Sequence, residues 1–170
     1  MNTKTFILII LTAFWSCIIY SQEDSSTEKE KAQPEIQAGK CERKALQQGD
    51  FGKHFFEQYQ NYEPNISILN KLKNRIYNYS ITVVLGTWCR DSKEQVPRFF
   101  KILDNINYNT NDVKIICIDR SKKAGDTDIS DLNIERVPTF IFYKNNLEKG
   151  RIIETPQETL EKDIQKIITD

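Results

Sequence analysis

Ile81-Thr82-Val83-Val84-Leu85-Gly86-Thr87-Trp88-Cys89-Arg90-Asp91-Ser92 is the stretch of sequence that decides the fold. It begins with apolar and β-branched residues, which predict a buried strand at Ser80–Leu85. A helix is predicted directly afterwards, over Asp91–Asp104, so Cys89 would lie where a strand passes into a helix. Free N–H groups and the helix dipole at that position favour a thiolate, which is the form of cysteine that attacks disulfides.

Two proline motifs follow in a fixed order. Pro97 lies eight residues after Cys89, inside the predicted helix. Pro138, in Val137-Pro138-Thr139, lies 49 residues after Cys89 and precedes a β-branched and aromatic run. A proline suits the start of a strand, because it has no N–H to donate to the ladder. With the Trp-Cys-x-x motif, these features make residues 79–170 resemble the thioredoxin superfamily, and in particular a Bacteroidetes-type branch with a Cys-x-x-Ser site. The resemblance implies a cis Val137–Pro138 bond in a loop that packs against Cys89.

Position 92 determines which reactions are open to such a site. A dithiol oxidoreductase holds its second cysteine there, whereas this chain has Ser92. Many thioredoxins also place a buried aspartate six residues before the cysteine, where this chain has Val83. A single thiol can form a mixed disulfide but cannot resolve it, so these two departures argue against an autonomous dithiol reductase.

The candidate site residues are Cys89, Ser92, Trp88, Arg90 and Pro138. Arg90 and the Ser92 hydroxyl would favour the thiolate, while Trp88 and Pro138 would shield and position it. The leading hypothesis is thiol–disulfide exchange with protein thiols or disulfides, through mixed disulfides at one cysteine. The alternative is a non-enzymatic module that binds an extended peptide between Trp88 and Pro138. Reduction of a small oxidant such as a peroxide ranks last, because no second acid or threonine lies before the cysteine in a suitable spacing.

The predicted organisation is an α/β chain with a thioredoxin-like fold, in which helices flank a central mixed sheet of about four strands. The expected segments are a signal peptide (1–21), a disordered linker (22–38), an N-terminal helical extension (39–78) and the thioredoxin-like domain (79–170). Within the extension, helices are expected at Lys40–Gln48, at Phe51–Tyr62 and from Asn65 onward. Their aromatic and apolar stripes favour a structural role over substrate binding. Downstream, strands are expected at Asp112–Ile118, Thr139–Tyr143 and Glu148–Glu154, with a final helix opening at Thr155-Pro156.

The first 21 residues carry Lys4 and an apolar core before a polar start, which predicts export to the periplasm or outside the cell. Cys17 leaves open a lipoprotein signal, which would anchor the protein to a membrane. Without residues 1–21, the chain would have one more acidic than basic residue, which gives no argument for nucleic acid binding. Cys41 could be a distal thiol that resolves Cys89 or a free surface cysteine, and Cys117 reads as a buried hydrophobe. His54 is the single histidine and reads as a surface residue. No Cys/His spacing suggests a metal site, so no metal or other cofactor is expected.

Overall fold

The computed structural model describes Ile36 and residues 38–169. Contacts divide the chain into Met1–Ala32 and Gln33–Asp170, and every described residue belongs to the second unit. The predicted signal peptide, Cys17 and nearly all of the predicted linker therefore lie outside the described residues.

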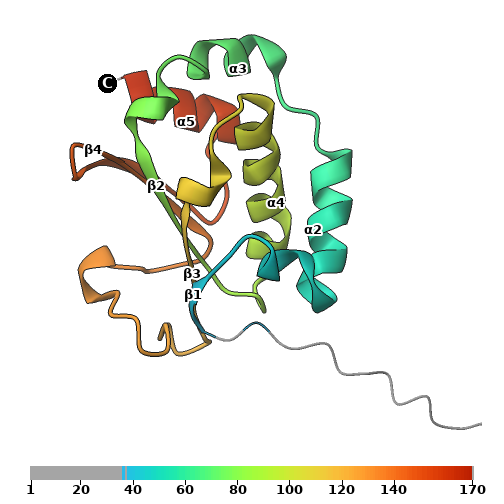
Figure 1. The fold of residues 1–170 in the computed structure, drawn as a ribbon, viewed down its shortest axis with the longest axis vertical. Coiled ribbons are helices and arrows are strands. Elements are labelled where there is room, and N and C mark those ends of the chain that lie inside the picture. Colours follow the sequence, from blue (N-terminus) through green and yellow to red (C-terminus); the bar gives the residue numbers. More distant parts are fainter. Residues whose placement is uncertain (1–35, 37, 170) are drawn as a thin grey trace, which may run out of the picture. The chain divides into compact units, whose positions relative to one another are not determined.

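A five-stranded mixed sheet forms the centre of the described chain, in the order β1-β3-β2-β4-β5 (Figure 1). The central strand β2 runs parallel to β3 and antiparallel to β4, while β1 and β5 are antiparallel edge strands. The strands are β1 (Gly39–Cys41), β2 (Ser80–Leu85), β3 (Lys114–Cys117), β4 (Thr139–Lys144) and β5 (Leu147–Ile153). Together with the helices, this is the predicted thioredoxin-like fold.

The α-helices lie on one side of the sheet, and a long connector (residues 119–137) lies on the other (Figure 1). The helices are α2 (Gly49–Asn61), α3 (Ile66–Leu72), α4 (Arg90–Asn105) and α5 (Leu160–Thr169). Short 3₁₀ turns occupy η1 (Ala45–Gln47), η2 (Ile76–Asn78), η3 (Thr110–Asp112) and η4 (Ser130–Leu132). Within the connector, η4 is the one helical turn, and an isolated antiparallel bridge pairs Ala124 with Thr127.

Successive side chains of each strand point to opposite faces of the sheet, and this produces two separate apolar cores. Ile81, Val83 and Leu85 of β2 face the helices and belong to the larger core. Val84 faces the opposite way and packs with Ile116 and with residues of the connector. Because successive side chains point to opposite faces, the sheet separates the contents of one core from those of the other.

The N-terminal segment differs from its prediction. A helix was expected over Lys40–Gln48, but Gly39–Cys41 form the edge strand β1, which pairs with β3, and only Ala45–Gln47 make a 3₁₀ turn. The sheet therefore has five strands rather than about four. The cause is a tertiary contact. Three residues are too few to show a hydrophobic pattern in the sequence, and they take the strand conformation because they pair with the edge of β3.

The last helix also begins later than expected, at Leu160 rather than at Thr155-Pro156. Asp163 and Thr159 account for the delay. The Asp163 Oδ2 atom accepts a hydrogen bond from the Gln157 backbone N–H at 2.6 Å, which fixes a turn ahead of the helix. Thr159 Oγ1 then accepts from the Lys162 N–H at 3.3 Å, as an N-cap residue does.

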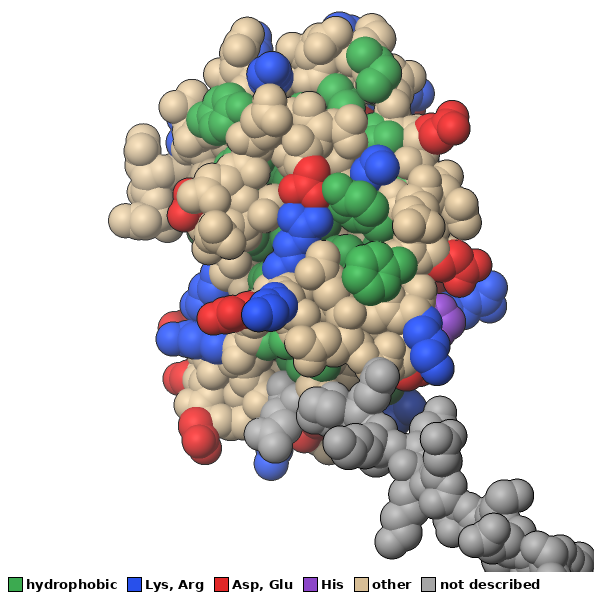
Figure 2. All heavy atoms as spheres, turned by 45° about the vertical axis from the view of Figure 1, so that its right-hand side comes forward, with side chains coloured by type: hydrophobic (Ala, Val, Ile, Leu, Met, Phe, Trp, Pro, Cys, Tyr) green, Lys and Arg blue, Asp and Glu red, His purple; other side chains and the backbone are tan. Residues whose placement is uncertain are grey.

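Helices α2 and α3 are fastened to the rest of the fold by a buried carboxylate. Glu161 of α5, only 2% exposed, accepts hydrogen bonds from the Tyr62 hydroxyl and the Asn65 N–H, both at 3.0 Å. The face that carries α2 shows apolar side chains in separate groups, interrupted by polar and charged ones (Figure 2). The hydrogen bonds of Glu161 with Tyr62 and Asn65 agree with a structural role for α2 and α3.

A half-buried ion pair joins the segment after β1 to the end of α4. The Arg43 guanidinium donates to both Asp104 oxygens, at 2.8 Å and 2.5 Å, and the Tyr59 hydroxyl donates to Oδ2 at 2.6 Å. Burial alone would raise the pKa of Asp104, but the hydrogen bonds from Arg43 and Tyr59 outweigh it and hold the pKa below its usual 3.8.

Asp104→Asn should lower the free energy of unfolding at neutral pH by about 1–3 kcal/mol, because the charged partner of Arg43 is lost. The folded-state pKa of Asp104 is depressed, so its contribution is complete above the unfolded value of 3.8 and disappears as pH falls through the folded value. Urea unfolding of variant and wild type should therefore converge in acid. Asp126→Asn, at an exposed position, is the matched control, and an equal loss there would contradict the prediction.

Candidate functional site

Cys89 is the N-cap residue of α4, as the sequence predicts. Its backbone is extended (φ −83°, ψ 129°), and its carbonyl accepts the Lys93 N–H at 3.1 Å, which begins the helix. Its own N–H donates to the Gly86 carbonyl at 2.9 Å. The half-buried sulfur therefore lies at the positive end of a 16-residue helix.

The proline loop lies against this cysteine. The Val137–Pro138 bond is cis, and the Cys89 thiol donates a hydrogen bond from Sγ to the Val137 carbonyl at 3.1 Å. Both parts of the prediction for this loop are confirmed. Only the protonated thiol can donate this bond.

Ser92 has a different partner from the one expected. Its side chain is fully buried, and its hydroxyl accepts a hydrogen bond from the Gly86 N–H at 3.3 Å. No hydrogen bond joins Ser92 to the Cys89 sulfur in the part of the chain that the structure describes. The hydroxyl instead satisfies a backbone donor at the point where β2 ends, while Arg90 is exposed to solvent.

Trp88 forms the outer wall of the site and remains 38% exposed. Its indole Nε1 donates to the Ile118 carbonyl at 3.2 Å, and the Arg120 guanidinium carbon lies 4.8 Å from the ring centroid. Arg120 was not among the residues expected at the site. The available signal was its place just after β3, because the carboxyl ends of parallel strands meet at one edge of a sheet.

Gly86 gives the indole its position. A Cβ at residue 86 would lie 2.7 Å from Trp88 Cε2 and 2.9 Å from Nε1, closer than packed atoms approach. Gly86→Ala should therefore displace the indole from Ile118, increase acrylamide quenching of Trp88 fluorescence, and cost about 1–3 kcal/mol of stability. Trp15 is the only other tryptophan, so a Trp88→Phe chain supplies the background signal.

A double-mutant cycle with Trp88→Ala tests the cause of this effect. In the Trp88→Ala background, Gly86→Ala should cost much less than it does in the wild type. Equal costs in the two backgrounds would mean that the indole is not what excludes a side chain at residue 86.

The other described cysteines lie together, away from Cys89. Cys117 is 2% exposed in the helix-side core, and its sulfur lies 2.8 Å from that of Cys41. Contact with Cys41 and burial raise the pKa of the Cys117 thiol well above its usual range. Cys89 packs instead with the core on the connector side. Cys41 is thus placed beside Cys117, and its suggested role of resolving Cys89 finds no support in the geometry.

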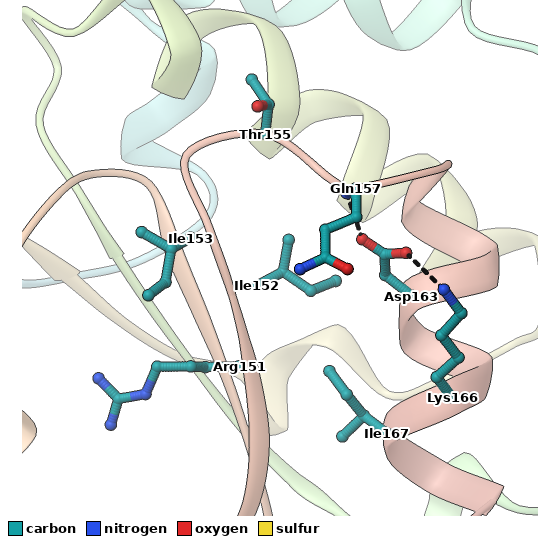
Figure 3. A pocket seen from close by; sticks show the side chains of 8 residues that line it. All are labelled: Arg151, Ile152, Ile153, Thr155, Gln157, Asp163, Lys166 and Ile167. Atoms are coloured by element: carbon teal, nitrogen blue, oxygen red, sulfur yellow. Dashed lines mark hydrogen bonds and ion pairs between the residues drawn. The ribbon is translucent and has the colours of Figure 1, made fainter.

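A pocket of about 250 Å³ lies between β5 and α5 (Figure 3). Its lining includes Asp163, whose carboxylate is already used to hold the turn before α5, and Lys166, which lies 4.0 Å from Asp163 Oδ1. The volume is below the roughly 300–1,000 Å³ typical of ligand sites. We therefore take this pocket as a packing feature and the surroundings of Cys89 as the candidate site.

Comparisons with known proteins give structural neighbours only. No family model matches the chain, and no curated protein matches it. Among solved structures, it is similar to thioredoxin O2 from Arabidopsis thaliana (20% identity, TM-score 0.41, covering 60% of this chain and 84% of that one). It is also similar to Trxlp from Edwardsiella tarda (16% identity, TM-score 0.40, covering 63% of this chain and 97% of that one). A third neighbour is a protein of unknown function from Pseudomonas aeruginosa (19% identity, TM-score 0.44, covering 69% of this chain and 79% of that one). Similarity at this level assigns no activity to the chain.

Across residues 38–169, no helix has both the length and the apolar character that a membrane span requires.

Proposed function

We propose that this protein exchanges thiols and disulfides with other proteins through one active-site cysteine, Cys89. The observation that carries the proposal is the position of its sulfur, half-buried at the N-terminus of α4 and in contact with the Val137 carbonyl. No second cysteine lies beside it in the described residues, since Cys41 and Cys117 contact each other. This arrangement favours a monothiol reaction.

The reaction begins with loss of the Cys89 proton and of its hydrogen bond to Val137. The thiolate attacks one sulfur of a protein disulfide, the S–S bond breaks, and the leaving thiolate takes up a proton from solvent. Ser92 cannot resolve the resulting mixed disulfide, because a hydroxyl does not exchange with it. A thiol of the substrate or a small external thiol must release Cys89. Isomerisation of protein disulfides and their reduction with an external thiol both meet this requirement.

We also propose that the protein is exported, with residues 1–21 as the signal. The support is the short basic start and apolar core of the sequence, followed by a polar, charged segment. Intact-mass measurement of protein isolated from its host separates the two routes of export. A chain starting near Gln22 supports secretion, acylated Cys17 supports the lipoprotein form, and a retained Met1 in a soluble cytosolic fraction contradicts both.

Trapping the mixed disulfide tests the activity. The reduced full chain is mixed with oxidised glutathione, quenched with acid at short times, and mapped by mass spectrometry. A glutathione adduct should form on Cys89 first, and Cys89→Ala should abolish it and also stop insulin reduction with added thiol. Cys41→Ser is the matched control and should leave adduct formation at Cys89 unchanged. Slower modification of Cys89 than of Cys41 would contradict the proposal.

The peptide-binding alternative has its own observation, the exposed Trp88 indole with Arg120 stacked on it. The same experiment separates the two. A protein that reduces no disulfide, yet captures an unfolded reduced chain equally well with Cys89 or with Ala at that position, is a binding module.

A further inference from the structure

Cys41 and Cys117 face each other across the pairing of the edge strand β1 with β3. In the antiparallel register, Gly39 is opposite Cys117 and Cys41 is opposite Ile115. Residues two apart on a strand point to the same face, so Cys41 and Cys117 are diagonal neighbours on the helix side of the sheet.

The two sulfur atoms are closer than unbonded atoms of their size ordinarily pack. Their separation is 2.8 Å, whereas even the smaller carbon atoms pack at about 3.5–4.0 Å. A disulfide bond of about 2.05 Å requires the sulfurs to approach by less than about 1 Å more. Both side chains already lie in the same apolar cluster, so this approach calls for a small rotation of the side chains.

We propose that Cys41 and Cys117 form a disulfide that fastens β1 to the sheet and leaves Cys89 as the free thiol of the described chain. The proposal does not rest on the activity proposed for Cys89, which packs on the other face of the sheet.

The bond forms by exchange with an external disulfide, such as oxidised glutathione or a protein disulfide. Cys41 is the more accessible of the two thiols and attacks first, which breaks the external S–S bond, releases one external thiol and leaves a mixed disulfide on Cys41. The Cys117 sulfur then attacks the Cys41 sulfur and releases the second external thiol. Two cysteine thiols are oxidised and one external disulfide is reduced to two thiols, so hydrogens and electrons balance.

Peptide mapping without reductant tests the proposal on the full chain. After incubation with oxidised glutathione, a peptide linking Cys41 to Cys117 should appear, two hydrogen atoms lighter than the separate thiol peptides. It should form equally in a Cys89→Ser chain, so the result stands apart from any failure of the Cys89 activity. A stable glutathione adduct on Cys41 with Cys117 still a thiol, or a link from either residue to Cys89, overturns the proposal.

Thermal unfolding gives a second readout. Dithiothreitol should lower the Tm of the oxidised wild type by roughly 5–10 °C, because the bond closes a long loop of the unfolded chain. Cys41→Ser alters a half-exposed edge residue and is expected to fold, and its Tm should not respond to dithiothreitol. If dithiothreitol does not change the Tm of the wild type either, and no linked peptide is found, the two residues are unbonded thiols.

Discussion

Ser92→Cys should raise disulfide reduction by the protein at least about tenfold over the wild type when the external thiol is limiting. Residue 92 lies one helical turn after Cys89, and both residues contact Gly86, whose N–H donates to the Ser92 hydroxyl and whose carbonyl accepts the Cys89 N–H. A thiol at residue 92 would attack the Cys89 mixed disulfide within one molecule. In the proposed monothiol reaction, the wild type would depend on a thiol from solution. The insulin reduction rate, measured against the concentration of added thiol, provides the test.

Two matched variants isolate the cause of this gain. Ser92→Ala removes the same hydroxyl without adding a thiol, so its rate should not exceed that of the wild type. Ser92→Cys combined with Cys89→Ala should be inactive, because the buried residue 92 is shielded from substrate. The prediction fails if the wild type already matches the Ser92→Cys rate without added thiol.

Val83 limits how large the gain can become. This residue is fully buried in β2 on the helix side of the sheet and offers no carboxylate to remove a proton from a new thiol. Combining Ser92→Cys with Val83→Asp should therefore raise the rate further at neutral pH, at a cost in stability from the buried acid.

Phe99→Ala should destabilise the fold by about 3–5 kcal/mol. Phe99 is fully buried where α4 meets the sheet, with its ring centroid 4.5 Å from that of Phe140 and 6.1 Å from that of Phe142. Removing the ring leaves a cavity between α4 and β4. Urea unfolding monitored by circular dichroism measures the loss.

Phe56→Ala is the matched control, because this phenylalanine of α2 is 50% exposed. Its cost should stay within about 0.5 kcal/mol. Similar losses for the two variants would mean that burial is not what makes Phe99 important.

The parts of the fold that could be predicted from the sequence carry their own local signal. Ser80–Leu85 has the same bounds in the structure as in the prediction, because five buried residues in succession leave little ambiguity for a central strand. The contact between Cys89 and Val137 followed from the order and spacing of two motifs. Those features depend on residues close in sequence or on a pattern shared across a superfamily.

The parts that could not be predicted depend on contacts between distant segments. Gly39–Cys41 become a strand only because β3 offers an unpaired edge, and the neighbouring Lys, Glu and Arg residues favour a helix when read alone. The contact of Cys41 with Cys117 follows from that pairing, so it could not be predicted from the sequence either. The stacking of Arg120 on Trp88 joins residues 32 positions apart, with no periodicity to indicate it.

The described cysteines lie on opposite faces of the sheet. Cys89 meets solvent and the connector on one face, while Cys41 and Cys117 lie among the helices on the other. The sheet therefore lies between the sulfur of Cys89 and the sulfurs of Cys41 and Cys117. In the monothiol reaction proposed above, this separation would keep a mixed disulfide at Cys89 from passing directly to Cys41 or Cys117 of the same molecule.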